Sequence, residues 1–420
     1  MQDCRKGSRK RLVRYHASWI LPISEPPIRD GWLAVDGGRV VALGAAGKRV
    51  LSDGAAVVDL GDVAVLPGLV NAHTHLELSA LRGTVPGGAG FVPWVEHMIG
   101  VRAEIQPEQD AAAIEDAVAE LESCGTTAVG EVTNSLAAVP ALVRRGLVGS
   151  VFHEVFGVEL ASLEKRVAEL PRVVEEHVGV WPASAFAYVP SPHTLYTAHP
   201  TVVRRLVAKA RESGLRATLH LAEHAAERRF LEQGDGPIPA WYESRLKLPR
   251  SRLEWPRMSP VAFADDLGAL GPHVTCVHLT DARPQELALV AERGAPVVLC
   301  PRSNLFIEAR LPPLLAVLAA GIAPALGTDS LASNASLDVL AEARALADRF
   351  PTVRPRDLVA MATWGGARAL GREDVGRIAQ GARPGLFAID ADVAGDPCAF
   401  VLANVRRPRR WITRRQGSAS

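Results

Sequence analysis

The 420-residue chain is 48% hydrophobic and 22% charged, so it can bury a large core, and its length predicts two or three domains unless an α/β barrel takes most of it. The net charge of +1 gives no electrostatic reason to expect binding to nucleic acid or to an acidic membrane. No apolar run approaches the roughly 18 residues that a membrane-spanning helix needs. The five cysteines are scattered and form no Cys-x-x-Cys pair, which predicts free thiols in a reducing cytoplasm.

The first 64 residues predict a small β module. Gly31–Val35 and Arg39–Leu43 flank Asp36-Gly37-Gly38, a turn sequence typical of a β-hairpin. Short strands and turns return over residues 376–412. We therefore expect residues 1–64 and 373–420 to build one β-sandwich domain from both ends of the chain.

From Val65 onward, predicted strands alternate with predicted helices. The eight strands are one that ends at His73–Glu77, followed by Thr126–Val132, Ser150–Phe156, Ala185–Val189, Arg216–Leu221, Val274–Leu279, Ala295–Cys300 and Ala323–Gly327. This alternation predicts an α/β fold with a (β/α)8 TIM-type barrel over residues 65–372. The proline-rich passage at residues 234–260 is expected to be an insertion over one end of the barrel.

Polar side chains stand where these strands end, which is where barrels of this type place catalytic residues. His73 and His75 are two residues apart, so in a strand they project to the same face, and Glu77 would join them if the strand continued that far. Five of the 12 histidines fall at strand ends. The full set of strand-end candidates is His73, His75, Glu77, His193, His220, Glu223, His278 and Asp329.

Three imidazoles and one carboxylate with room for water would form an open catalytic site for Zn²⁺ or Fe²⁺. Such an ion would lower the pKa of a bound water toward about 7, and Glu223, three residues after His220, is placed to manage the proton. Other interpretations remain open at single positions. Asp329 could cap a helix, and His278 could be structural. His193 could be a hydrogen-bond partner behind the site, and Glu77 an ordinary polar residue.

The motif Pro67-Gly68-Leu69-Val70-Asn71-Ala72-His73-Thr74-His75, with His220-Leu221-Ala222-Glu223, His278 and Gly327-Thr328-Asp329, resembles the amidohydrolase superfamily. It is most similar to the branch with one metal ion, which contains nucleoside deaminases and chlorohydrolases. The resemblance implies that His73, His75, His220 and Asp329 hold the metal and that Glu223 shuttles the proton. It also implies that His278 and Asp329 activate and orient the water, and that His193 contacts substrate.

The six lysines, none of them at a strand end, disfavour the branch in which a carboxylated lysine bridges two metal ions. The variant His73–Gly83, followed by a glycine-rich loop and Phe91-Val92-Pro93-Trp94-Val95, looks most like aminodeoxyfutalosine deaminases of menaquinone synthesis. Their substrate is a 6-amino purine nucleoside that carries a benzoate.

On this interpretation Glu77 accepts a hydrogen bond from a ribose hydroxyl, Arg82 or Arg302 pairs with the benzoate, and Ser333 also contacts the substrate. The alternatives within enzymes are a deaminase of S-adenosylhomocysteine, methylthioadenosine or another purine, and a chlorohydrolase-like hydrolase. The alternative outside enzymes is a non-catalytic metal-binding scaffold, which the presence of Glu223 disfavours. The family resemblance also implies a homodimer.

Overall fold

The computed structural model describes residues 12–46, 55–253, 255–391 and 395–415. Strands from both ends of the described chain form one seven-stranded sheet, in the order β16-β15-β5-β1-β2-β3 with β4 beside β1. The hairpin prediction is confirmed, because β2 and β3 pair antiparallel around Gly37 and Gly38, which both have positive φ. The strands of this sheet are β1 (Val13–Ile20), β2 (Ile28–Asp36), β3 (Arg39–Ala45), β4 (Ala56–Asp59), β5 (Val63–Pro67), β15 (Leu386–Asp390) and β16 (Arg410–Thr413).

The central part of the chain forms two parallel sheets, with strand orders β14-β6-β7-β8-β9 and β10-β11-β12-β13. The sheets meet where the His220 N–H of β10 donates to the His193 carbonyl just after β9. Strands β7 and β8 are buried at every residue, as expected for parallel strands covered on both faces. The strands are β6 (Leu69–His75), β7 (Thr126–Thr133), β8 (Val148–Val155), β9 (Phe186–Pro192), β10 (Ala217–Leu221), β11 (Val274–His278), β12 (Val297–Leu299), β13 (Ala325–Leu326) and β14 (Asp329–Ser330).

Helices surround these strands, and several begin with proline at their first turn, where its missing N–H and fixed φ fit a helix start. The helices are α1 (Phe91–Arg102), α2 (Pro107–Ser123), α3 (Val139–Arg144), α4 (Leu160–His177), α5 (Pro200–Glu212), α6 (Ala225–Gln233), α7 (Pro237–Arg245), α8 (Pro260–Asp266), α9 (Pro284–Arg293), α10 (Pro301–Glu308), α11 (Leu314–Ala319), α12 (Val339–Arg349), α13 (Pro355–Ala360), α14 (Gly366–Ala369) and α15 (Pro397–Ala403). Short turns of other helical types are η1 (Leu76–Leu81), η2 (Arg250–Arg252) and η3 (Met361–Gly365).

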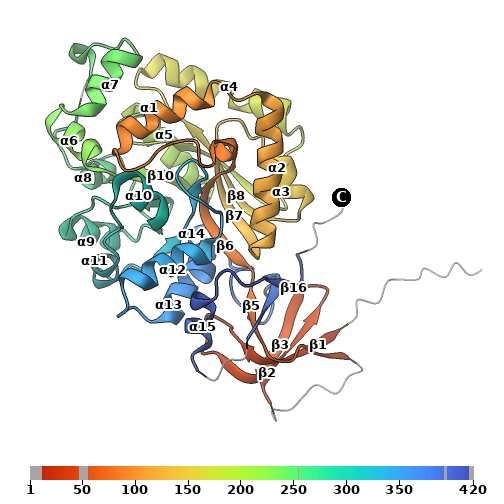
Figure 1. Ribbon diagram of the computed structural model, residues 1–420. Helices are drawn as coiled ribbons and strands as arrows, with labels where there is room; N and C mark the ends of the chain where they lie inside the picture. Colours follow the sequence, from red (N-terminus) through yellow and green to blue (C-terminus); the bar gives the residue numbers. More distant parts are fainter. Residues whose placement is uncertain (1–11, 47–54, 254, 392–394, 416–420) are drawn as a thin grey trace, which may run out of the picture.

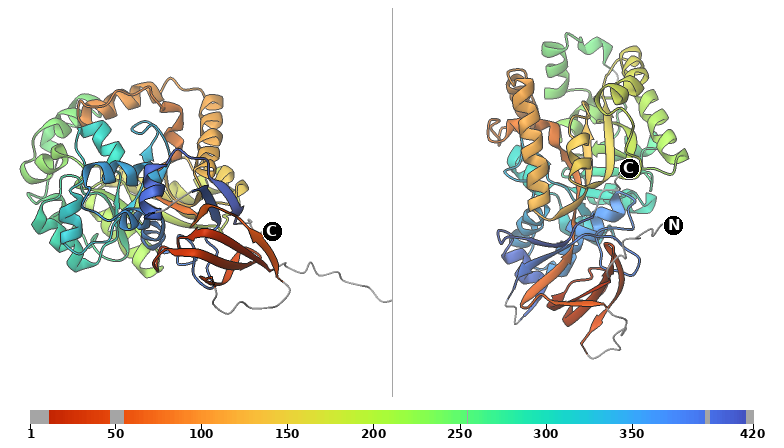
Figure 2. Two further views of the ribbon diagram at one scale, coloured as in Figure 1. Left: turned by 60° about the horizontal axis from the view of Figure 1, so that its bottom comes forward. Right: turned by 90° about the vertical axis from the view of Figure 1, so that its right-hand side faces the viewer.

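The α/β class is confirmed, and the alternation of parallel strands with helices is of the TIM-barrel type. The complete (β/α)8 barrel, the β-sandwich and the three expected domain ranges remain predictions. Strand β5 lies across the expected boundary after residue 64, since it pairs with β15 and leads through Gly68 directly into β6. Figures 1 and 2 show the seven-stranded sheet at one end of the molecule and helices α1 and α7 at the other.

Two local expectations differ from the structure, and one helix was not predicted. The first barrel strand ends at His75, and residues 76–81 form the helical turn η1, so Glu77 does not continue the strand face of the two histidines. Residues 397–403 of the expected strand-and-turn tail form α15, and residues 301–308, for which no element was predicted, form α10. Both helices begin with a proline, Pro301 after Cys300 and Pro397 after Asp396, and proline at the first position is a helix-start signal. Each helix is too short for its apolar residues to show a clear helical period.

Among the described residues, every helix is too short or too polar to traverse a lipid bilayer. Cys124, Cys276, Cys300 and Cys398 are free thiols, and Cys4 lies outside the described residues.

Candidate active site

Strand β6 carries the first two candidate ligands, and its position depends on close packing. A Cβ at Gly68 would lie 2.6 Å from the Cβ of Thr127, so only glycine allows the chain to enter β6 beside β7. Asn71 then ties β6 to the last strands, because its amide group exchanges hydrogen bonds of 2.7 and 3.1 Å with the side chain and backbone of Thr328. This pairing brings His73 and His75 next to Asp329.

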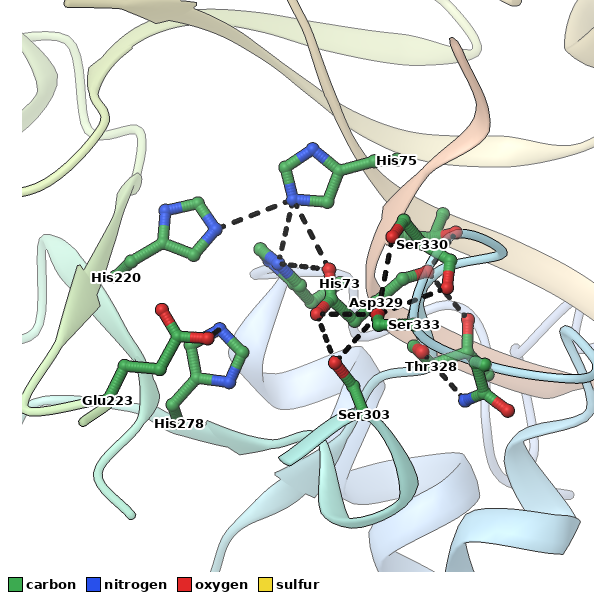
Figure 3. Close-up of polar contacts among 12 residues, drawn as sticks. His73, His75, His220, Glu223, His278, Ser303, Thr328, Asp329, Ser330 and Ser333 are labelled. Carbon is green, nitrogen blue, oxygen red and sulfur yellow. Dashed lines mark hydrogen bonds and ion pairs between the residues drawn. The ribbon is translucent and has the colours of Figure 1, made fainter. Parts of the chain in front are cut away.

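Three strands converge on one point at this edge of the fold (Figure 3). The Nε2 atom of His75 lies 3.2 Å from Nε2 of His73 and 3.4 Å from Nε2 of His220. Oδ1 of Asp329 lies 3.6 Å from Nε2 of His75 and 3.9 Å from Nε2 of His73. Four donor atoms bound to one Zn²⁺ at about 2.0–2.2 Å in a tetrahedron are roughly 3.3–3.6 Å apart. The His/His/His/Asp cluster is therefore compatible with one metal ion.

The electrostatics of the cluster favour neutral imidazoles. Burial, reinforced by neighbouring imidazoles, lowers the pKa of His73 and of His220 well below the usual value. Burial alone would raise the pKa of Asp329, but His75, His278 and His73 together hold it below its usual value. Neutral imidazoles and an ionised carboxylate are the forms that coordinate a divalent cation.

Hydrogen bonds behind the cluster orient its members. His220 Nδ1 lies 3.1 Å from the backbone carbonyl of His193, which leaves Nε2 of His220 facing the cluster. Oδ2 of Asp329 accepts from the hydroxyls of Ser303 and Ser333, so Oδ1 is free to face His75. The structure thus places Ser333 beneath Asp329 and outside the cavity lining.

Glu223 lies at the same point of convergence, just past the end of β10. Its Oε1 is 3.5 Å from Nε2 of His278. The carboxylate of Glu227 accepts the backbone N–H groups of Ala222 and Glu223, at 3.1 and 2.8 Å, and so anchors this strand end. Burial, with the nearby charges of Asp329 and Glu227, raises the pKa of Glu223 well above the usual value. A carboxyl group with a raised pKa can both accept and return a proton near neutral pH.

A cavity of about 280 Å³ opens from the cluster. Its inner lining consists of strand-end side chains, and its outer lining consists of apolar residues from α1 and α7. The inner residues include His75, Glu77, Glu154, His193, His220, Glu223, His278 and Asp329, and the outer ones Phe91, Val92, Trp94, Val95, Met98, Ile99, Ile238, Trp241 and Tyr242. The passage expected as an insertion therefore includes a helix, α7, that lines the cavity.

The structure brings two of the five expected substrate contacts to the cavity and leaves three outside it, Ser333 and the two arginines. His193 lines the cavity, with its Nδ1 2.7 Å from the Thr197 hydroxyl. Glu77 also lines it, but its carboxylate accepts from the Thr133 and Ser135 hydroxyls and from two backbone N–H groups. It anchors the loop after β7.

Arg82 donates to the Ala335 carbonyl and is paired with Glu120, and Arg302 donates to the Ser336 hydroxyl. Neither arginine lines the cavity.

The sequence interpretation did not include Glu154, which is the next-to-last residue of β8 and lines the cavity. Its Oε1 has no hydrogen bond among the described residues and lies 3.4 Å from Nδ1 of His220. Burial raises the pKa of Glu154 well above its usual value. The residue stands at the end of a predicted strand, so the criterion that selected His193 and His220 was sufficient to find it.

Comparison with known proteins places the chain in a family. The model of the amidohydrolase family matches residues 64–407, and the chain belongs to this family. Over 375 residues it is 32% identical to the 5-methylthioadenosine/S-adenosylhomocysteine deaminase of Nitratidesulfovibrio vulgaris, which covers 86% of this chain and 79% of that protein. Over 322 residues it is 33% identical to the aminodeoxyfutalosine deaminase of Deinococcus radiodurans, with 73% of each chain covered.

Solved structures agree with the fold. The crystal structure of Helicobacter pylori aminofutalosine deaminase with methylthio-coformycin matches with a TM-score of 0.85 at 21% identity, over 96% of this chain and 98% of that one. An adenosine deaminase from Xanthomonas campestris with bound zinc matches with a TM-score of 0.74 at 26% identity, over 94% and 88%. The family and these relatives identify the protein as a hydrolase that acts on carbon–nitrogen bonds.

Proposed function

We propose that this protein is a metal-dependent aminohydrolase that converts a 6-amino purine nucleoside to the 6-oxo product and ammonia. The observation that carries the proposal is Glu223 beside the His/His/His/Asp cluster, in one cavity. A non-catalytic scaffold would have no need of a buried carboxyl group with a raised pKa next to a metal site.

In this mechanism His73, His75, His220 and Asp329 hold the ion, with Zn²⁺ favoured and Fe²⁺ as the alternative. The bound ion supplies Lewis acidity that makes water a nucleophile at neutral pH. Glu223 takes a proton from the attacking water and delivers it to N1 of the purine as C6 is attacked. His278, 3.5 Å from Glu223, and Asp329 orient the water, and His193 contacts the purine nucleoside from the wall of the cavity.

For the particular substrate we propose aminodeoxyfutalosine, with 5′-methylthioadenosine as the second candidate. With C6 at the cluster, the sugar and its 5′ substituent point outward toward α1 and α7. Aromatic and aliphatic side chains line that end, and no lysine or arginine of the described chain lines the cavity. A methylthio group or an aryl ring suits this wall better than the amino-acid end of S-adenosylhomocysteine, which brings two charged groups on an aliphatic chain, whereas a benzoate brings one charged group on an aromatic ring.

We further infer a cytoplasmic homodimer with the chain divided at residues 64 and 372. The free thiols Cys124, Cys276, Cys300 and Cys398 support the reducing compartment. The homodimer and the two divisions rest on the sequence resemblance, and β5 runs on from residue 63 to residue 67 across the first of them. Gel filtration with light scattering measures the oligomer, and a monomeric mass would remove the dimer.

The direct experiment is an ammonia-release assay on purified, metal-loaded protein with aminodeoxyfutalosine, 5′-methylthioadenosine, S-adenosylhomocysteine and adenosine. We expect turnover of the first two to exceed that of the others. Turnover of none of the four would sink the deaminase proposal, and a clear preference for S-adenosylhomocysteine would remove only the proposed substrate.

A further inference from the structure

A second cavity, of about 1000 Å³, lies between α2, α12 and the segment that leads from α15 into β16. We call it the arginine pocket, because its lining includes Arg145, Arg302, Arg344, Arg406, Arg407, Arg409 and Arg414. The arginine pocket shares no lining residue with the cavity at the histidine cluster. Figure 1 shows α12 and α15 near the seven-stranded sheet, whereas α1 and α7, which line the active-site cavity, lie at the opposite end of the molecule.

The charges of the arginine pocket are unbalanced. Two carboxylates of the described chain line it, Glu122 and Asp338, although the whole sequence has nearly equal numbers of basic and acidic residues, 47 and 46. Glu122 is shared, because both Arg145 and Arg414 form ion pairs with it. Asp338 is already engaged by Arg409, which donates to its two oxygens at 2.8 and 2.6 Å. The other arginines of the pocket must therefore find partners elsewhere.

Two of these arginines pair with carboxyl groups that lie outside the lining. Arg344 pairs with Asp348, one turn further along α12, at 2.7 Å. Arg302 lies 3.6 Å from Glu342, which also accepts the backbone N–H of Arg302 at 2.8 Å. Burial raises the pKa of Glu342 to about 7, so this carboxyl group is not fully ionised at neutral pH and compensates Arg302 only in part.

Two further arginines have no carboxylate partner in the described chain. Arg407 donates to the backbone carbonyl of Asp390 at 2.9 Å, and Arg406 forms no hydrogen bond or ion pair with the described residues. Together with the shared Glu122, they leave at least three positive charges unbalanced in one cavity. Like charges held in a concave site repel one another and concentrate anions from solution. The arginine pocket is thus built to be neutralised by an anion with several charges.

We propose that the arginine pocket binds a small molecule that carries a diphosphate or triphosphate group. Such a group brings enough negative charge to neutralise the excess, and the planar fork of a guanidinium donates two parallel hydrogen bonds to phosphate oxygens. A volume of about 1000 Å³ is that of a small-molecule site, and the net charge of +1 gives no reason to expect a longer polyanion. The inference is independent of the proposed deaminase function.

The test titrates the full-length, metal-loaded protein with inorganic tripolyphosphate and with ATP in a calorimeter. The wild type is compared with the double variant Arg145→Gln/Arg406→Gln. The matched control, Arg172→Gln/Arg205→Gln, removes two exposed arginines of α4 and α5 that lie outside the pocket, and so changes the net charge equally. We expect the double variant to bind both probes at least about tenfold more weakly, the size of a lost hydrogen bond to a charged group, and the control to match the wild type. Equal affinities for the two probes would assign recognition to the phosphates alone, and tighter binding of ATP would extend the site to the nucleoside.

Thermal unfolding separates binding in the pocket from removal of the metal, because polyphosphates also chelate divalent ions. Occupation of the pocket raises the melting temperature by mass action, whereas loss of the metal lowers it. Arg145→Gln leaves Glu122 paired with Arg414, and Arg406 is exposed, so the double variant should fold normally. Heats and melting temperatures that respond alike in the wild type and the double variant, or no response of the wild type to either probe, would overturn the inference. Either result leaves the proposed function intact, since deamination is assayed without the probes.

Discussion

At the inner end of the cavity, the side chains come from the ends of β6, β8, β10, β11 and β14, and they are imidazoles and carboxyl groups whose pKa values are shifted by burial. At the outer end, the side chains come from α1 and from α7, and they are mostly apolar. Residues at the strand ends are held in place by the neighbouring strands of the sheet. The helices α1 and α7 instead lie over the strands. The comparison indicates that chemistry depends on the rigid inner end and substrate choice on the outer one.

Removal of the metal is expected to have the largest effect. Dialysis against a chelator should abolish deamination and lower the melting temperature, because an ion that binds only the folded state stabilises it by mass action. Addition of Zn²⁺ or Fe²⁺ in separate samples should restore both properties and identify the preferred ion. Full activity in protein that elemental analysis shows to be metal-free would contradict the assignment of the inner end.

Glu223→Gln should retain the metal and lose about 10²–10⁴-fold in kcat, since the amide is nearly isosteric but cannot carry the proton. Elemental analysis and steady-state kinetics measure the two properties. Glu243→Gln, on the exposed side of α7, is the matched control and should leave kcat unchanged. Near wild-type turnover in Glu223→Gln would exclude the proton shuttle.

Glu154→Gln tests whether the inner end also contributes to binding. Glu154 lines the inner end of the cavity, where the purine ring would lie with C6 at the cluster, so we expect KM to rise by about tenfold while kcat and metal content change less. The exposed Glu159→Gln serves as control. Loss of the metal with unchanged KM in the loaded fraction would instead assign Glu154 to the support of His220.

Arg82→Ala and Arg302→Ala should have the smallest effects, with kcat/KM for aminodeoxyfutalosine within about twofold of wild type. Their guanidinium groups lie outside the cavity lining, and exposed ion pairs contribute little to stability. Steady-state kinetics with the benzoate-bearing nucleoside decides the matter. A tenfold or larger loss of kcat/KM for aminodeoxyfutalosine in either variant, with kcat/KM for 5′-methylthioadenosine unaffected, would show that this arginine pairs with the benzoate. It would also weaken the contrast between the two ends of the cavity.

Much of the inner end could be predicted from the chain because each strand is a short local pattern that ends in a polar residue. His73 and His75 share a strand face by spacing alone, His220 and His278 lie in the last two residues of strands of the same kind, and Asp329 follows shortly after β13. Parallel strands bring their carboxyl ends to one edge, so residues more than 250 positions apart meet without any need to know the packing in detail.

Only the tertiary structure decided the rest, because it depends on backbone turns and on contacts between distant segments. The chain turns into η1 after His75, which sends Glu77 to the loop after β7. Ala222, His278 and Asp329 adopt positive φ angles that only the surrounding fold makes favourable, and these set the directions of neighbouring catalytic groups. The outer wall of the cavity is formed by α1 and by α7, which begins about 140 residues later in the chain. The periodicity of residues within a segment does not predict which distant helices meet across a cavity, or which indole nitrogens are buried there without a hydrogen-bond partner.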